Sequence, residues 1–128
     1  MDPKIQSLIK NLLSKTKNRE SLWEKTRAKT DRFTINLEYG LIHIDKLLSS
    51  KGYIVYQFVI FNSNGDSIIN ILGSNGELNT IQEFDALKEL YEAIKHSYYK
   101  VDDTINGLIS ETSKEGGIGK KLDDGLPF

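Results

Sequence analysis

Few side chains in this sequence have the types and spacing that catalysis or metal binding requires. The histidines His43 and His96 stand alone, and cysteine is absent, so no zinc site with the usual ligand spacing can be assembled from neighbouring residues. Glu89 and Glu92 could act as general acid and base, but acids three residues apart on a helix are typical of a solvated face. We therefore expect a non-catalytic protein with no metal and no cofactor.

The last residues of the sequence carry the clearest signal for binding. Phe128 offers an aromatic ring and an α-carboxylate on one residue, a combination that suits capture by a receptor pocket with a basic lip. Pro127 fixes its own φ and favours an extended Leu126, so less entropy is lost on docking. Asp123 and Asp124 would speed the encounter with a basic rim. We expect the partner-binding residues to be Asp123, Asp124, Leu126, Pro127 and Phe128.

This ending resembles the acidic tip of bacterial single-stranded DNA-binding proteins, which is a run of aspartates followed by Ile or Leu and a terminal Pro-Phe. In that family the tip recruits helicases, nucleases and other genome-maintenance proteins. Asp123 and Asp124 match the acids, and Phe128 matches the anchor, whereas Gly125 stands where another acid is usual. The resemblance covers about six residues and implies a protein partner in DNA metabolism. It does not extend to the all-β barrel of that family.

The composition limits the other kinds of partner. The chain has 128 residues, enough for one domain, and a net charge of −1 from 17 basic and 18 acidic residues, unlike most duplex-binding domains. No apolar run approaches the roughly 20 residues that cross a bilayer, and we expect a cytoplasmic protein without a membrane partner. A local excess of basic residues in the first quarter of the chain leaves weak binding of single-stranded nucleic acid as an alternative: Lys10, Lys15, Lys17, Arg19, Lys25, Arg27, Lys29 and Arg32.

The spacing of apolar residues predicts an α+β fold over residues 1–110. Asp2 and Pro3 begin an amphipathic helix, and alternating patterns predict a meander of four antiparallel strands at about 33–39, 41–44, 53–61 and 67–72. A long C-terminal helix should follow from residue 80 to about 110, with a break, if any, near Asn106 and Gly107. Trp23 should turn into the core, and both helices should cover one face of the sheet. Residues 111–128 are expected to be a flexible linker and an acidic docking tail.

The strand at 53–61 supplies a second candidate surface. Alternation places Tyr53 and Phe61 on one face of the sheet and Tyr56 and Phe58 on the other. An uncovered face would expose aromatic rings for a partner, a second copy in a homodimer, or stacked bases. The chain is thus interpreted first as an adaptor or accessory protein of bacterial or phage origin that docks through its tail. The alternative is an immunity, anti-defence or antitoxin-type protein that acts through its sheet face.

Overall fold

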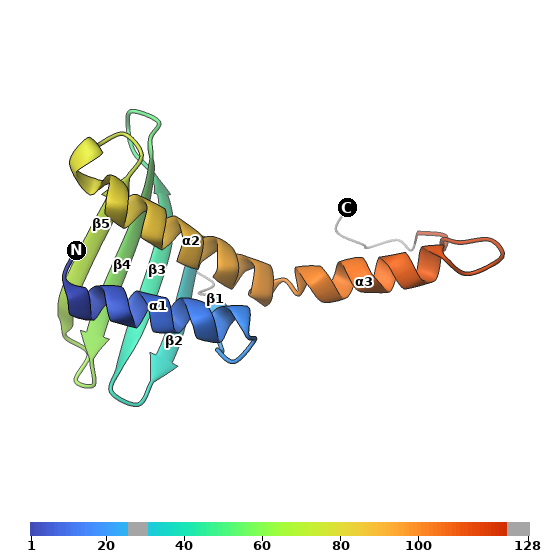
Figure 1. Cartoon of the computed structure of the whole chain (residues 1–128), viewed down its shortest axis with the longest axis horizontal. Helices are drawn as coiled ribbons and strands as arrows, with labels where there is room; N and C mark the ends of the chain where they lie inside the picture. Colours follow the sequence, from blue (N-terminus) through green and yellow to red (C-terminus); the bar gives the residue numbers. More distant parts are fainter. Residues whose placement is uncertain (26–30, 123–128) are drawn as a thin grey trace.

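The computed structural model describes residues 1–25 and 31–122 and shows an α+β fold with an N-terminal helix and a five-stranded antiparallel sheet (Figure 1). The strand order in the sheet follows the chain, β1-β2-β3-β4-β5. Helices α1 and α2 lie on the same side of this sheet and pack against each other, whereas α3 extends away from it. The elements are α1 (Pro3–Lys17), β1 (Glu24–Lys25), β2 (Arg32–Leu37), β3 (Gly40–Leu48), β4 (Ile54–Asn62), β5 (Ser67–Ser74), the 3-10 turn η1 (Leu78–Thr80), α2 (Ile81–Tyr98) and α3 (Val101–Thr112).

The predicted count of four strands misses β1, a two-residue edge strand that pairs with β2 through Glu24↔Thr34 and Lys25↔Phe33. Trp23, just before it, is buried as expected, and its indole nitrogen donates to the Thr16 hydroxyl at 3.1 Å. This contact fixes the chain between α1 and β1. The strand predicted at residues 41–44 is β3, which starts earlier and runs further than predicted, over Gly40–Leu48. The turn before it therefore falls on Glu38 and Tyr39.

The helix ends follow local capping chemistry only in part. Asp2 caps α1 as expected, because its carboxylate accepts from the Lys4 amide at 2.7 Å. The prediction of one long C-terminal helix is wrong: α2 ends at Tyr98 and α3 begins at Val101. Lys100 between them has φ of 51°, a left-handed conformation that interrupts the helix. The break therefore lies at Tyr99 and Lys100, and Gly107 stays inside α3.

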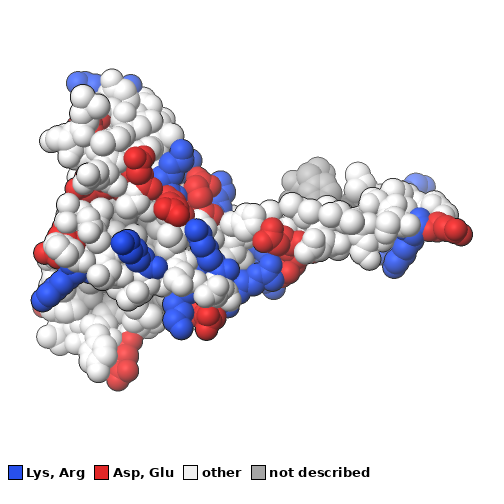
Figure 2. Space-filling model, viewed as in Figure 1, with Lys and Arg blue, Asp and Glu red and all other residues white. Residues whose placement is uncertain are grey.

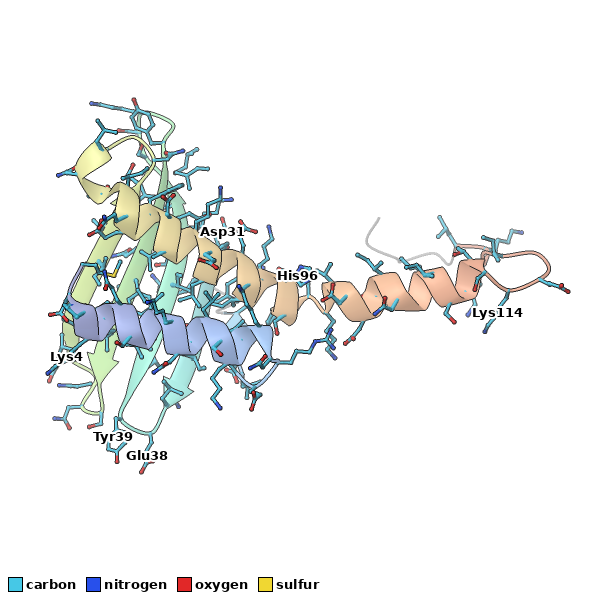
Figure 3. All side chains as sticks on the ribbon, in the orientation of Figure 1. Lys4, Asp31, Glu38, Tyr39, His96 and Lys114 are labelled. Carbon is cyan, nitrogen blue, oxygen red and sulfur yellow. The ribbon has the colours of Figure 1, made fainter. Side chains whose placement is uncertain are left out.

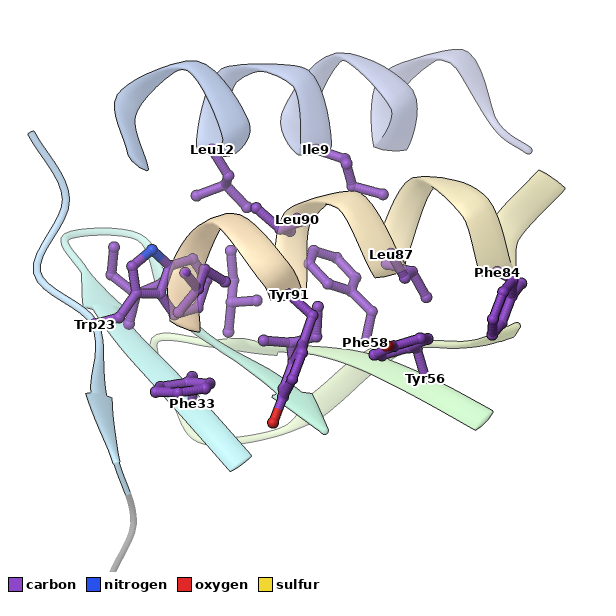
Figure 4. Close-up of a cluster of buried hydrophobic side chains, with 14 residues drawn as sticks. Ile9, Leu12, Trp23, Phe33, Tyr56, Phe58, Phe84, Leu87, Leu90 and Tyr91 are labelled. Atoms are coloured by element: carbon purple, nitrogen blue, oxygen red, sulfur yellow. The ribbon is translucent and has the colours of Figure 1, made fainter. Parts of the chain in front are cut away.

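The core lies between the sheet and the two helices that cover it (Figure 4). Tyr91 of α2 packs against Phe33 and Tyr56, with ring centroids 5.5 and 5.4 Å apart, and Leu87 and Leu90 fill the neighbouring space. α1 contributes Ile9 and Leu12, whose spacing on one helix face was the sequence signal for this packing. These contacts leave the opposite face of the sheet without a covering helix among the described residues.

Gly73 allows β5 and α2 to approach each other closely. A Cβ atom at this position would lie 2.3 Å from the backbone nitrogen of Phe84. We expect Gly73→Ala to destabilise the protein by about 1–3 kcal/mol, because either the strand or the helix must shift. Equilibrium unfolding in urea would measure the loss. Gly107→Ala is the matched control, because a Cβ there meets nothing within 4 Å and alanine favours the helix; equal losses in the two variants would contradict this account.

Candidate functional site

The predicted docking residues Asp123, Asp124, Leu126, Pro127 and Phe128 lie outside the described residues. The structure does describe the segment that leads to them, residues 113–122, which follows the end of α3. Every residue of this segment is exposed. α3 itself contains no buried residue and points away from the sheet and the other helices (Figure 1). The described chain is therefore solvated throughout its last twenty-one residues, 102–122.

α3 has an apolar stripe without a partner among the described residues. Val101 is partly buried at its start, but Ile105, Leu108 and Ile109 are 48%, 55% and 60% exposed. Their spacing continues the buried face of α2, which is why the sequence predicted one long packed helix. In the structure α3 extends beyond the edge of the sheet. Its apolar side chains therefore do not contact the core.

The junction between α2 and α3 is held by ion pairs to the loop after α1. The Arg19 guanidinium lies 2.8 Å from Asp103 and 3.8 Å from Asp102, and Asp102 also contacts His96 at 3.0 Å (His96 is labelled in Figure 3). Arg19 adopts a positive φ of 59° at this point. All four side chains are more than half exposed, so each pair contributes little to stability. They link the loop after α1 and the end of α2 to the first turn of α3.

An open groove of about 530 Å³ lies at the same junction, between the C-terminal ends of α1 and α2 and the start of α3. Its charged lining is mixed, with Lys17, Arg19 and Lys100 facing Glu89 and Asp103. The hydroxyl residues Thr16 and Ser97 also line it, and His96 contacts the Asp102 carboxylate at 3.0 Å. Among the described residues no cluster of three or more His, Asp or Glu side chains could hold a metal ion.

Of the basic residues in the first quarter, Arg27 and Lys29 lie outside the described residues, and most of the others bind another side chain. Lys15 lies 3.6 Å from Glu20, Lys17 lies 3.4 Å from Glu89, and Arg32 is bound to Asp45. Lys25 donates to the Tyr99 hydroxyl. Figure 2 shows blue and red side chains interspersed over the helical side of the molecule. A phosphate backbone would have to compete with these acids, which does not favour electrostatic binding of nucleic acid.

The four aromatic residues of the predicted surface site lie in different environments. Tyr56 and Phe58 are buried under α2, so the expectation that they belong to a surface site is wrong. Tyr53 is exposed near the end of the sheet, and its ring covers Gly76. Phe61 is partly buried on the face of the sheet opposite α1 and α2, and its ring centroid lies 4.9 Å from that of His43. A continuous aromatic platform therefore does not exist on either face.

The face of the sheet opposite the helices, here called the open face, comprises the side chains of β2 to β5 that alternate away from α1 and α2. At its middle, Arg32 donates to both carboxylate oxygens of Asp45, at 2.6 and 2.9 Å. Asp45 is only 2% exposed although no described helix covers it. Its hydrogen bond is the main cause that raises the pKa of the Arg32 guanidinium. Sequence reasoning missed this pair, because it depends on the register Arg32↔Asp45.

His43 lies on the same face, at the edge of a shallow hollow of about 380 Å³ that Leu41 and Phe61 also line. Burial lowers the pKa of His43 below its ordinary value, Arg32 lowers it further, and Asp45 opposes them. The unfolded chain therefore binds a proton at a higher pH than the folded protein does. The stability that neutral His43 contributes is complete above the pKa of about 6.5 that a histidine has in the unfolded chain. It is lost as the pH falls through the lower pKa of His43 in the folded protein.

We expect the urea midpoint to fall between about pH 7 and pH 5 less steeply in His43→Gln than in the unmodified chain. Measuring the midpoint of both proteins at each pH isolates the histidine, since the carboxylates are common to both. Above about pH 7.5 the two profiles should run parallel. A variant whose midpoint falls as steeply as that of the unmodified chain would contradict the shift.

Two further observations concern the chain as a whole rather than one surface. None of the helices in residues 1–25 and 31–122 is long and apolar enough to cross a membrane. Comparisons of the chain with protein-family models, with curated proteins and with solved structures find no match.

Proposed function

We propose that this chain is a non-catalytic adaptor that docks through residues 123–128, here called the tip, onto genome-maintenance proteins of a bacterial cell. The observation that carries the proposal is the sequence Asp-Asp-Gly-Leu-Pro-Phe, which resembles the acidic tip of bacterial single-stranded DNA-binding proteins. The gene encoding it would belong to the bacterium or to a phage or mobile element that uses the same docking code. The folded body would bind something else.

The chemistry of the tip supports this proposal. Transfer of the Phe128 ring into an apolar pocket would contribute about 2–3 kcal/mol. Asp123 and Asp124 would add attraction to a basic rim, and salt should weaken that part of the affinity. Gly125 supplies no charge where the related tips carry an acid, so the electrostatic share should be smaller than theirs.

The way the chain leads to the tip also supports the proposal. α3 contains 12 residues and spans about 18 Å, and the ten exposed residues after it include Gly116, Gly117 and Gly119. A peptide that must enter a pocket on another protein needs a reach of this kind, because otherwise the two folded bodies would collide. Within the described residues nothing packs on this segment that docking would have to displace.

A pull-down from bacterial lysate tests the proposal. The full chain should capture helicases or nucleases, and a variant lacking Leu126, Pro127 and Phe128 should not. Leu122→Ala is the matched control, since Leu122 is an exposed apolar residue just before the tip and should not change the capture. If the truncated variant captures the same proteins as the full chain, or if neither captures any, the proposal fails.

An immunity or antitoxin-type protein that acts through the open face is the alternative function. The observation that favours it is the low number of free charges on that face, which is typical of an interface core. Such a protein would keep its partner after truncation of the tip and lose it on substitution of Leu72, an exposed open-face residue of β5. The variant without Leu126, Pro127 and Phe128 and a variant substituted at Leu72 therefore separate the two functions.

A further inference from the structure

The open face differs from an ordinary solvated sheet face in its charges. The structure describes all of β2 to β5, and on their open side the only charged residues are Arg32 and Asp45, which bind each other; the edge strand β1 adds the exposed Glu24 on the same side, opposite Thr34. The sequence as a whole is 27% charged. The helical side of the molecule carries many lysines and acids (Figure 2). Loss of charged residues is the compositional mark of an interface core rather than of solvated surface.

Two pairs of polar side chains in the middle of the open face bind each other. Gln57 donates to the Asn70 side chain at 3.2 Å, in addition to the pair between Arg32 and Asp45. Val59, next to them, is buried even though no described helix covers it. A second surface placed over these pairs would therefore cost less desolvation than one placed over unpaired polar groups.

On β3 and β4 the exposed and partly buried apolar residues lie on either side of this polar middle, whereas Leu72 on β5 lies in the same row as Asp45 and Gln57. Leu41 pairs with Phe61 at the end of the strands near the β2–β3 turn, and Leu47 pairs with Val55 towards the other end. Leu72 on β5, opposite Gln57, is 50% exposed. Two copies can pack with their open faces together and a two-fold axis in the plane between them, through the middle of the face. The apolar ends of the β3–β4 pair in one copy then lie on the apolar ends of that pair in the other copy, and the two polar middles lie on each other. The face is therefore complementary to itself.

We propose that the open face is the interface of a homodimer, in which two sheets pack face to face around a two-fold axis. Four strands about 4.8 Å apart, each about eight residues long at 3.3 Å per residue, present about 500 Å² per copy. The total of about 1,000 Å² reaches the lower bound of specific interfaces. Sheets packed in this way lie about 10 Å apart with strands near −30°. A nucleic-acid partner would find no free Lys or Arg on this side of β1 to β5, because Arg32 is bound to Asp45 and β1 adds only the acid Glu24, whereas a second copy needs none.

The dimer does not rest on the proposed docking function. It covers the sheet and leaves the helical side, α3 and the segment after it uncovered. A dimer would present two tips, so a partner with two receptor sites would be bound with higher avidity. Truncation of the tip should leave the dimer intact, which makes the two proposals separable.

Sedimentation velocity of the full chain over a concentration series tests the dimer. The unmodified protein should sediment as a dimer with a dissociation constant in the micromolar range or below. Leu72→Glu should weaken the dimer by at least about a hundredfold, because the two-fold axis buries a glutamate from each copy. Leu78→Glu is the matched control: Leu78 is 91% exposed on η1, away from the open face, and this variant should remain a dimer. Circular dichroism should show the same fold in both variants.

A cross-link locates the interface independently. The chain contains no cysteine, so Gln57→Cys places one thiol in the middle of the open face, and a short bis-maleimide should join two copies. Leu78→Cys should give no cross-linked dimer. A monomer at every concentration would overturn the proposal. So would a dimer that is insensitive to Leu72→Glu, or one that is not joined through residue 57, because either result would place the contact elsewhere.

Discussion

Phe128→Ala should weaken binding to a receptor of the acidic tip of bacterial single-stranded DNA-binding proteins by roughly 30- to 150-fold. This range corresponds to the 2–3 kcal/mol expected for transfer of the ring into an apolar pocket. Because the proposed tip is a docking peptide, the substitution should not change the free energy of unfolding. Isothermal titration calorimetry of both proteins with the purified receptor measures the difference.

A further variant tests the electrostatic contribution to tip binding. Gly125→Asp should strengthen binding at low salt and lose this advantage at high salt, since it restores an acid to the tip. Equal affinity of the Phe128→Ala variant and the unmodified chain would contradict the role of Phe128 as the anchor of the tip.

Phe58→Ala should cost about 3–5 kcal/mol of unfolding free energy, because the ring is fully buried beneath α2 and its loss leaves a cavity in a close-packed core. Phe61→Ala should cost much less, since Phe61 is only partly buried and faces the other side of the same strand. Urea unfolding at a concentration below that of dimer formation compares the two residues without a contribution from association. Similar losses for both would contradict the assignment of the two faces.

Much of the fold follows from apolar spacing in the sequence. The helix after Asp2, the antiparallel meander and the burial of Trp23 were predicted because each rests on a local pattern. β1 was missed because two residues are too few to show alternation. The break at Lys100 was missed because the apolar spacing runs through it without a glycine or proline. Gly107, which has the sequence signal of a break, lies within an exposed helix that continues past it.

The candidate surfaces were less predictable, because they depend on contacts between distant residues. Arg19 lies 84 positions from Asp103, and Lys17 lies 72 positions from Glu89, so the pairing of the basic quarter with acids is not visible in local sequence. The same holds for Asp45, which alternation places on the open side of its strand but which Arg32 and the neighbouring strands bury. The tip is the opposite case: its signal is entirely local, and it comes from residue types rather than from the fold.

Displacement of a fluorescent tip peptide tests the central claim most directly. The peptide carries the acidic tip of a bacterial single-stranded DNA-binding protein and is bound to its purified receptor. Unlabelled full-length chain is then added. The adaptor account predicts that the full chain displaces the peptide, whereas the variant lacking Leu126, Pro127 and Phe128 does not. Displacement by both proteins, or by neither, would contradict docking through the tip.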